Sequence, residues 1–210
     1  MNTGFNIFRE KLFQQGIFSI TSIRIIFPGF NTDNLLSWQK KGYILKIRNG
    51  WYCFKEFLSV TDHHFLIANN IYQPSYVSHQ EALSYYGLIP EHIVNSVSIS
   101  TNKTQVFNFY GKVYKYYSVK PAFFFGYCLK NMTVNGENRN FMIAEKEKAI
   151  LDLLYIYDFY RTAQDLEEIR FNEQVLQNDI DWKKMDEFLK RFGIISLEKK
   201  ILTIKKIYNI

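Results

Sequence analysis

Basic and amide side chains near the amino-terminal end are the residues of this sequence best suited to bind another molecule. Lys46 and Arg48 lie two positions apart in an alternating segment, so they are expected to project from the same side of a strand. Asn34, Ser37 and Lys41 recur at i, i+3 and i+7, which places them on one face of a helix. Lysine and arginine bind phosphates, while asparagine and serine reach base edges, so this pattern indicates nucleic-acid binding. The candidate DNA-binding set is Asn34, Ser37, Lys40, Lys41, Lys46, Arg48 and Asn49.

The distribution of charge agrees with a polyanionic partner. Residues 1–54 carry seven basic and two acidic side chains, a net of +5 out of the +6 of the whole chain. A basic amino-terminal part therefore adjoins a nearly neutral remainder, which favours electrostatic attraction to nucleic acid. Charge alone leaves an alternative open, because small domains often carry a few extra lysines that only face solvent.

The elements that must position these residues follow from the apolar spacing. Helices are expected at about 5–15 and 18–27, with a third before Gly42. Two alternating stretches, 43–48 and 51–54, are joined by Asn-Gly, the strongest two-residue hairpin signal. Three short helices followed by a hairpin is the order of a winged helix-turn-helix. We therefore predict a DNA-binding domain over residues 1–57, and the alternative is a helix-hairpin packing module with solvated lysines.

The third helix can pack in two ways. Either Leu35 with Trp38 or Leu36 with Gln39 would face the core, and both pairs have helical spacing. In either case a polar face remains for a groove of DNA, and the paired cations of the hairpin would grip phosphate beside it.

Residues 58–210 are expected to form a second domain in which helices surround a small antiparallel sheet, so the fold class is α+β. Ser78 and Glu81 form the Ser-x-x-Glu pattern of a capping box at the start of a helix that ends at Gly87. Other helices are predicted at about 62–72, 145–157, 163–170, 181–192 and 197–208, and strands at about 94–100, 104–110, 112–119, 123–129 and 140–143.

Three segments resemble blocks of the AbiEi family of antitoxins. Residues 42–52 (GYILKIRNGWY) are similar to the family's wing, and residues 77–90 (VSHQEALSYYGLIP) to its Ser-containing helix block. Residues 143–154 (IAEKEKAILDLL) are similar to its Glu-Lys-Ala block. Trp51 departs from the pattern, because a small or aliphatic residue is common there.

The resemblance implies a two-part protein of the cytoplasm without a cofactor. Its winged helix would bind inverted repeats in the double-stranded DNA of its own promoter, as a monomer or weak dimer that binds cooperatively. Its second domain would counteract a cognate nucleotidyltransferase-like toxin, with or without direct contact. An alternative function is a protein-interaction module that neutralises a partner without specific DNA binding.

The family blocks also have structural explanations. Ser78 and Glu81 are explained by helix capping, and Gly87 by a left-handed residue after a helix. Glu147 and Asp152 are explained by surface pairing or local hydrogen bonds.

Little in the sequence favours an enzyme, a metal site or a membrane protein. Asp179 and Asp181 are the one pair resembling the carboxylates of a metal-dependent transferase, but Asp181 suits a helix cap better. Cys53 and Cys128 stand alone, which predicts reduced thiols in the cytosol. No apolar run approaches the ~20 residues that span a bilayer. We expect no catalytic residues, no metal ligands, no cofactor and no membrane contact.

Overall fold

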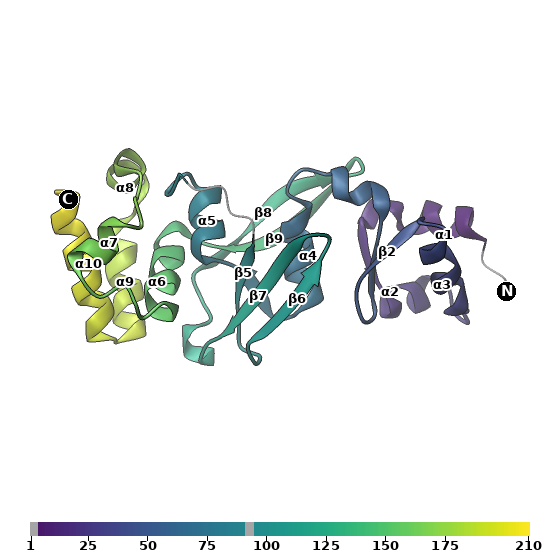
Figure 1. Ribbon diagram of the computed structural model, residues 1–210, viewed down its shortest axis with the longest axis horizontal. Coiled ribbons are helices and arrows are strands. Elements are labelled where there is room, and N and C mark those ends of the chain that lie inside the picture. The colour runs from purple at the N-terminus through teal and green to yellow at the C-terminus, as the bar shows by residue number, and fades with distance from the viewer. Residues whose placement is uncertain (1–3, 91–94) are drawn as a thin grey trace.

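The computed structural model describes residues 4–90 and 95–210. Over these ranges the protein has mixed α+β structure with ten α-helices and two β-sheets, of three and six strands. The elements are drawn out along one axis, with the amino-terminal helices at one end and the carboxy-terminal helices at the other (Figure 1). The predicted α+β class is therefore confirmed.

The amino-terminal unit contains three helices and the smaller sheet. Its elements in chain order are α1 (Phe5–Leu12), the short 3-10 helix η1 (Phe13–Gln15), β1 (Ile17–Ser19), α2 (Ile20–Ile26), α3 (Asp33–Lys40), β2 (Ile44–Arg48) and β3 (Trp51–Phe54). The strands lie in the order β1-β3-β2 and are antiparallel. Three helices followed by a hairpin are present as predicted, while their identity as a winged helix-turn-helix stays a prediction. Strand β1 was not predicted, because it is only three residues long and two of them, Phe18 and Ser19, fall in the segment expected to be helical.

Local signals explain these boundaries. The Ser19 hydroxyl accepts a hydrogen bond from the Ser22 amide at 3.0 Å, which caps the start of α2. Helix α3 ends where Gly42 adopts a φ of +72°, a left-handed conformation that glycine tolerates best. Leu35 and Trp38 are the buried pair of α3, whereas Leu36 is 61% exposed, so the first of the two packing alternatives is the one observed.

The larger sheet is mixed, which corrects the predicted antiparallel sheet. Its strands are β4 (Ser75–Val77), β5 (Ser96–Ser100), β6 (Gln105–Phe109), β7 (Lys112–Ser118), β8 (Tyr127–Val134) and β9 (Glu137–Ala144). They lie in the order β6-β7-β5-β4-β9-β8, and the pairs β5–β7 and β4–β9 are parallel. Alternation in a sequence shows that a segment is a strand but not which neighbour it pairs with. Position 94, the predicted start of β5, lies outside the described residues.

Strands β8 and β9 form a long hairpin. The sequence predicted two shorter strands here, at 123–129 and 140–143. The hairpin turn is Asn135-Gly136, with φ values of +49° and +87°. Positive φ at both turn residues is the type I′ geometry that Asn-Gly favours. Asn135-Gly136 is therefore a hairpin signal in the sequence itself.

Helices cover the sheet and extend beyond it. Helix α4 (His63–Ile71) packs on β4 and β9, and α5 (His79–Tyr85) packs on α6 (Lys146–Ile156). The remaining helices are α7 (Ala163–Glu167), α8 (Glu173–Asp179), α9 (Trp182–Phe192) and α10 (Ile195–Ile207), and Figure 1 shows them gathered with α6 at the carboxy-terminal end. All but α8 were predicted. In the part of the chain that is described, no helix has the length and apolar sequence needed to cross a bilayer.

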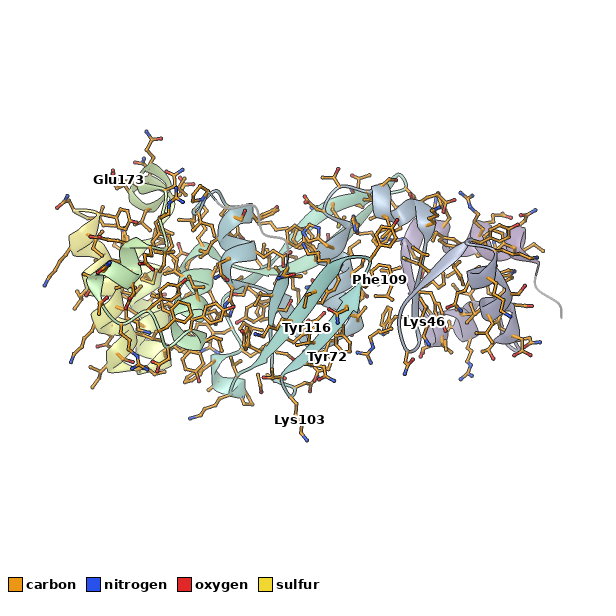
Figure 2. The ribbon with its side chains drawn as sticks, viewed as in Figure 1. Lys46, Tyr72, Lys103, Phe109, Tyr116 and Glu173 are labelled. Atoms are coloured by element: carbon orange, nitrogen blue, oxygen red, sulfur yellow. The ribbon has the colours of Figure 1, made fainter. Side chains whose placement is uncertain are left out.

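Two hydrophobic clusters divide the interior. Ten buried side chains from α1 to β3, Phe8 and Trp38 among them, form the amino-terminal cluster. The larger cluster fills the rest of the protein and takes in Ile17, Ile47 and Cys53 of the amino-terminal sheet. Side chains fill the space between these elements along the whole molecule (Figure 2). The predicted domain boundary after residue 57 stays a prediction. Ile17, Ile47 and Cys53 precede that boundary but belong to the core formed mainly by the residues after it.

Candidate nucleic-acid interface and a pocket beside it

Helix α3 presents a polar surface because its apolar residues are buried on the opposite side. Ser37, Lys40 and Lys41 are exposed and Asn34 is half-buried, while Leu35 and Trp38 pack in the amino-terminal cluster. Two of the predicted residues, Lys40 and Lys41, lie together at the carboxy-terminal end of the helix, where cations also stabilise the helix dipole. The structure therefore brings together the predicted α3 residues on the solvent side.

The hairpin does not keep its two predicted cations on one side. A register shift interrupts the β2–β3 pairing, in which Lys46 opposes Tyr52 and Arg48 opposes Trp51. Such a bulge breaks the strict alternation of side chains along a strand. Lys46 and Asn49 are exposed, whereas Arg48 is half-buried. The expectation that Lys46 and Arg48 project from the same side is therefore wrong.

Arg48 instead joins the amino-terminal unit to the rest of the chain. Its Nη1 donates a hydrogen bond to the Ile71 carbonyl oxygen at 2.5 Å, and its guanidinium carbon lies 4.7 Å from the centre of the Phe107 ring. Ile71 ends α4 and Phe107 lies on β6. The charge of Arg48 is thus used at this junction, not displayed at the hairpin tip.

The tip of the β8–β9 hairpin makes a second contact with the amino-terminal unit. Asn135 Nδ2 donates to the Phe13 carbonyl oxygen at 2.5 Å, and Arg139 Nη2 donates to the Gln14 carbonyl oxygen at 3.1 Å. Gly16 follows Phe13 and Gln14 closely in the chain, and a Cβ atom on it would lie 2.5 Å from the nearest atom of the Phe57 ring. No sequence signal could locate these contacts, since each joins residues more than 40 positions apart.

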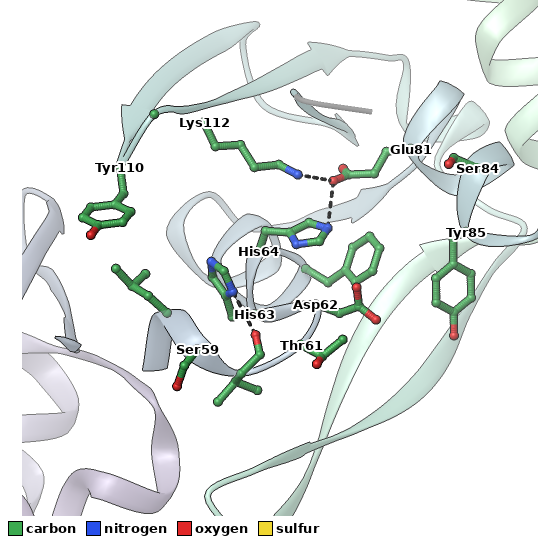
Figure 3. A pocket seen from close by; sticks show the side chains of 14 residues that line it. Ser59, Thr61, Asp62, His63, His64, Glu81, Ser84, Tyr85, Tyr110 and Lys112 are labelled. Atoms are coloured by element: carbon green, nitrogen blue, oxygen red, sulfur yellow. Dashed lines mark hydrogen bonds and ion pairs between the residues drawn. The ribbon is translucent and has the colours of Figure 1, made fainter. Parts of the chain in front are cut away.

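A pocket of about 690 Å³ opens between the start of α4, helix α5 and the β6–β7 turn (Figure 3). The Glu81 carboxylate is buried at its inner wall. Glu81 Oε1 lies 3.1 Å from Lys112 Nζ and 3.3 Å from His64 Nε2. Glu81 Oε2 accepts hydrogen bonds from the Ser96 hydroxyl at 2.5 Å and from the Val97 amide at 3.2 Å. Glu81 thereby ties four elements together.

These contacts overturn the predicted capping box. Ser78 occupies the position before α5, but its hydroxyl donates to Asp152 Oδ2 at 2.8 Å and caps no amide. Glu81 is turned toward β5 and β7 instead of the start of its helix. Burial explains the difference, because both side chains are drawn into long-range polar contacts in the interior.

Ser78 belongs to a buried polar network at the centre of the protein. Lys148 Nζ hydrogen-bonds Asp152 and donates to the Tyr76 hydroxyl at 2.8 Å. Burial lowers the pKa of Lys148 and raises that of Asp152, because each charge has been removed from water. Both side chains are 0% exposed, so surface pairing of Asp152 is wrong, whereas the other alternative, a local hydrogen bond, is observed with Lys148 four residues earlier in the helix. Glu147 is also buried and accepts from the Asp181 amide at 2.8 Å. The network is enclosed and has a structural role.

His79 lies beside this network between two rings. Its imidazole stacks on Tyr117 at 5.4 Å between centroids and meets the Tyr157 ring edge-on at 5.1 Å. Among the described residues neither ring nitrogen has a hydrogen-bond partner. Burial, followed by the charges of Lys148 and Lys115, lowers the pKa of His79 to about 3. The imidazole is therefore neutral at physiological pH.

The two aspartates suggested for a metal site serve other purposes. Asp179 pairs with Lys146 at 2.9 Å, and Asp181 accepts from the amides of Lys183 and Lys184, which caps α9 as predicted. Within residues 4–90 and 95–210, no group of three or more histidine, cysteine or acidic side chains could hold a metal ion.

The chain was also compared with known proteins. No family model matches it, and no curated protein matches it either. The resemblance to the AbiEi antitoxins therefore rests on residues 42–52, 77–90 and 143–154 alone, and membership of that family stays a proposal.

Proposed function

We propose that this protein is a DNA-binding transcriptional autorepressor and antitoxin that counteracts a nucleotidyltransferase-like toxin. Residues 5–54 would form a winged helix-turn-helix, with α3 in the major groove and the β2–β3 hairpin as the wing. The observation that carries the proposal is the exposed polar face of α3, held by a core that buries Leu35 and Trp38.

The order of elements supports this assignment. Helices α2 and α3 are separated by a short turn containing Pro28-Gly29, and α3 leads directly into the hairpin. A second helix in that position reads base edges through the side chains of its outer face, here the exposed Ser37 and the half-buried Asn34. The nearby lysines, Lys40 and Lys41, are suited to phosphates.

The proposed wing contact is Lys46, with the Asn49 side chain at the tip. Both are exposed, and Arg48 is excluded from this role by its contacts with Ile71 and Phe107. A single phosphate contact from Lys46 would contribute about 0.9 to the slope of log affinity against log salt concentration. The wing is therefore weaker in charge than the sequence suggests.

The test is binding to a labelled duplex taken from the DNA upstream of the coding sequence, with a scrambled duplex as competitor. We expect preferential binding to the upstream duplex and a loss of at least tenfold in affinity for Ser37→Asp or Lys41→Glu, because a new carboxylate would face phosphates. Lys103→Glu is the matched control, since Lys103 is exposed in the loop between β5 and β6. Equal binding of both duplexes would instead favour an interaction module without specific DNA recognition.

The antitoxin half of the proposal rests on the resemblance and needs its own experiment. Removal of residues 1–57 would strip Ile17, Ile47 and Cys53 from the larger core, so truncation is a poor test. Co-expression of the full chain with the toxin encoded beside it is preferable. We expect Lys41→Glu to lose repression and keep neutralisation. Failure of the unaltered chain to restore growth would refute the antitoxin role while leaving DNA binding untouched.

A further inference from the structure

One wall of the pocket in Figure 3 is lined by charged and polar side chains, and the DNA-binding proposal gives these side chains no role. The side chains of His64 and Lys112 are 20% and 19% exposed, and both lie against the buried Glu81 carboxylate. Glu81 Oε1 is itself inaccessible and, among the described residues, makes no aligned hydrogen bond. The Lys112 ammonium and the His64 imidazole thus both lie against the carboxylate, and Lys112 has N–H groups left for another acceptor.

The charged side chains of the lining are one lysine, Lys112, and two carboxylates. Glu81 is buried behind Lys112 and His64, and Asp62 is exposed at the rim. Burial lowers the pKa of His63, and the charges of His64 and Lys112 lower it further against the opposing effects of Asp62 and the Val60 carbonyl. His63 Nδ1 lies 2.9 Å from that carbonyl oxygen, which can only accept, so Nδ1 carries a proton and fixes the ring.

Tyr110 supplies an aromatic surface at the mouth. It is 69% exposed and adopts a φ of +48°, followed by Gly111 at +78°, in a two-residue turn of type I′ geometry. Asparagine is favoured at this position and a bulky side chain is not, because positive φ strains any residue with a large Cβ substituent. An exposed ring held in a strained turn beside a pocket points to a function for the ring. Figure 3 shows Tyr110, Lys112, His64 and His63 around the open part of the pocket.

We propose that this pocket binds a mononucleotide, with its phosphate at Lys112 and His64 and its base on the Tyr110 ring. A phosphate is the acceptor that suits converging lysine and histidine donors, and stacking on a tyrosine suits any base. The volume, about 690 Å³, lies within the range of small-molecule sites. Because the Glu81 carboxylate lies behind Lys112 and His64, its negative charge offsets that of Lys112, and affinity in the micromolar to millimolar range is expected.

Isothermal titration of the full chain with nucleoside 5′-monophosphates and with inorganic phosphate tests this proposal. Lys112→Met removes the ammonium and should weaken both ligands at least tenfold. Tyr110→Asn keeps the turn, because Asn-Gly is its favoured sequence, and should weaken the nucleotide at least fivefold but leave phosphate unchanged. Tyr110→Phe should retain nucleotide affinity, and Lys103→Met, outside the pocket, should change neither ligand.

Three results would overturn the proposal. The first is no heat and no thermal stabilisation of the unaltered chain by millimolar nucleotide. The second is nucleotide binding that survives Lys112→Met. The third is equal nucleotide affinity of Tyr110→Asn and the unaltered chain, which would exclude the stacking. None of these outcomes depends on DNA binding, so this proposal and the proposed function fail or stand separately.

Discussion

The Arg48 guanidinium donates a hydrogen bond to the Ile71 carbonyl oxygen, 23 residues further along the chain, at 2.5 Å. This contact, together with the Phe107 ring under the guanidinium, fastens the hairpin that follows α3 to α4 and β6. The β2–β3 hairpin, which is the proposed wing, is thus fixed to the larger part of the protein by Arg48. The sequence had predicted that Arg48 binds phosphate.

Arg48 and Lys46 should therefore give opposite results when each is replaced. Arg48→Leu should lower the free energy of unfolding by about 1–2 kcal/mol, since a charge-assisted hydrogen bond and a cation–π contact are lost. Lys46→Leu should leave stability within about 0.5 kcal/mol, because the side chain is exposed. Denaturant titration measures both. A stability loss for Lys46→Leu that matches Arg48→Leu would contradict the contacts described.

Gly16 provides a second test of the junction. Gly16→Ala should destabilise the protein by about 2–4 kcal/mol, because a Cβ would overlap Phe57 and Val134 and the residue has a φ of +68°. Gly50→Ala is the matched control: its φ is +81°, but among the described residues a Cβ there would meet no atom within 4 Å. The control should lose only about 1 kcal/mol, from backbone strain. Equal losses would mean that the junction is not closely packed.

The buried pair of Lys148 and Asp152 predicts a non-additive response. Lys148→Met alone should cost about 3–5 kcal/mol in stability, because it leaves the Asp152 carboxylate buried without its cation. Addition of Asp152→Asn should recover part of that loss, since the second charge is then removed as well. A double-mutant cycle by chemical denaturation gives the interaction energy, and simple additivity of the two losses would refute the coupling.

His79 predicts a specific dependence of stability on pH. The folded protein holds its imidazole neutral with a pKa of about 3, whereas the ordinary value is 6.5. The unfolded chain therefore binds an extra proton below 6.5, so His79 costs nothing above that pH and destabilises the fold as the pH falls below it. Between about pH 7.5 and pH 5 the loss is about 2 kcal/mol.

The variant His79→Phe isolates this contribution, because it keeps an aromatic ring between Tyr117 and Tyr157. Its stability should fall about 2 kcal/mol less than that of the unaltered chain over the same pH interval. Parallel pH profiles for the two proteins would show that His79 is not buried in the neutral form.

The features that could be predicted from the sequence are those that depend on residues close together in it. The boundaries of α3, the hairpin turn and the Asp181 cap depend on residues within a few positions, and the structure has them where the sequence indicates. Alternation along β2 was predicted for a regular strand, so the bulge that turns Arg48 away was missed. The bulge serves a contact with Ile71 that local patterns do not encode.

The predictions for the interior polar residues were wrong for a related reason. Ser78 and Glu81 match the sequence pattern of a helix cap, and Asp152 matches that of an exposed ion pair. Both patterns involve only residues close together in the sequence. Ser78 and Glu81 instead have partners in other elements, as when the Ser96 hydroxyl donates to Glu81. Asp152 does pair locally, with Lys148 four residues earlier in α6, but the pair is buried and also receives hydrogen bonds from Tyr76 and Ser78. The pocket likewise combines α4, α5 and the β6–β7 turn, and only the exposed Tyr-Gly turn, at positions 110 and 111, could have signalled it from the sequence.

The measurement that tests the central claim most directly is the salt dependence of binding to the upstream duplex, followed by fluorescence anisotropy. The unaltered chain should bind this duplex more tightly than the scrambled one. Lys41→Ala and Lys46→Ala should each reduce the slope of log affinity against log salt by about 0.9, while Arg48→Leu should leave the slope unchanged. If the unaltered chain shows no preference for its own upstream DNA, or if the slope is the same for all four proteins, α3 and the hairpin are not a DNA-binding surface.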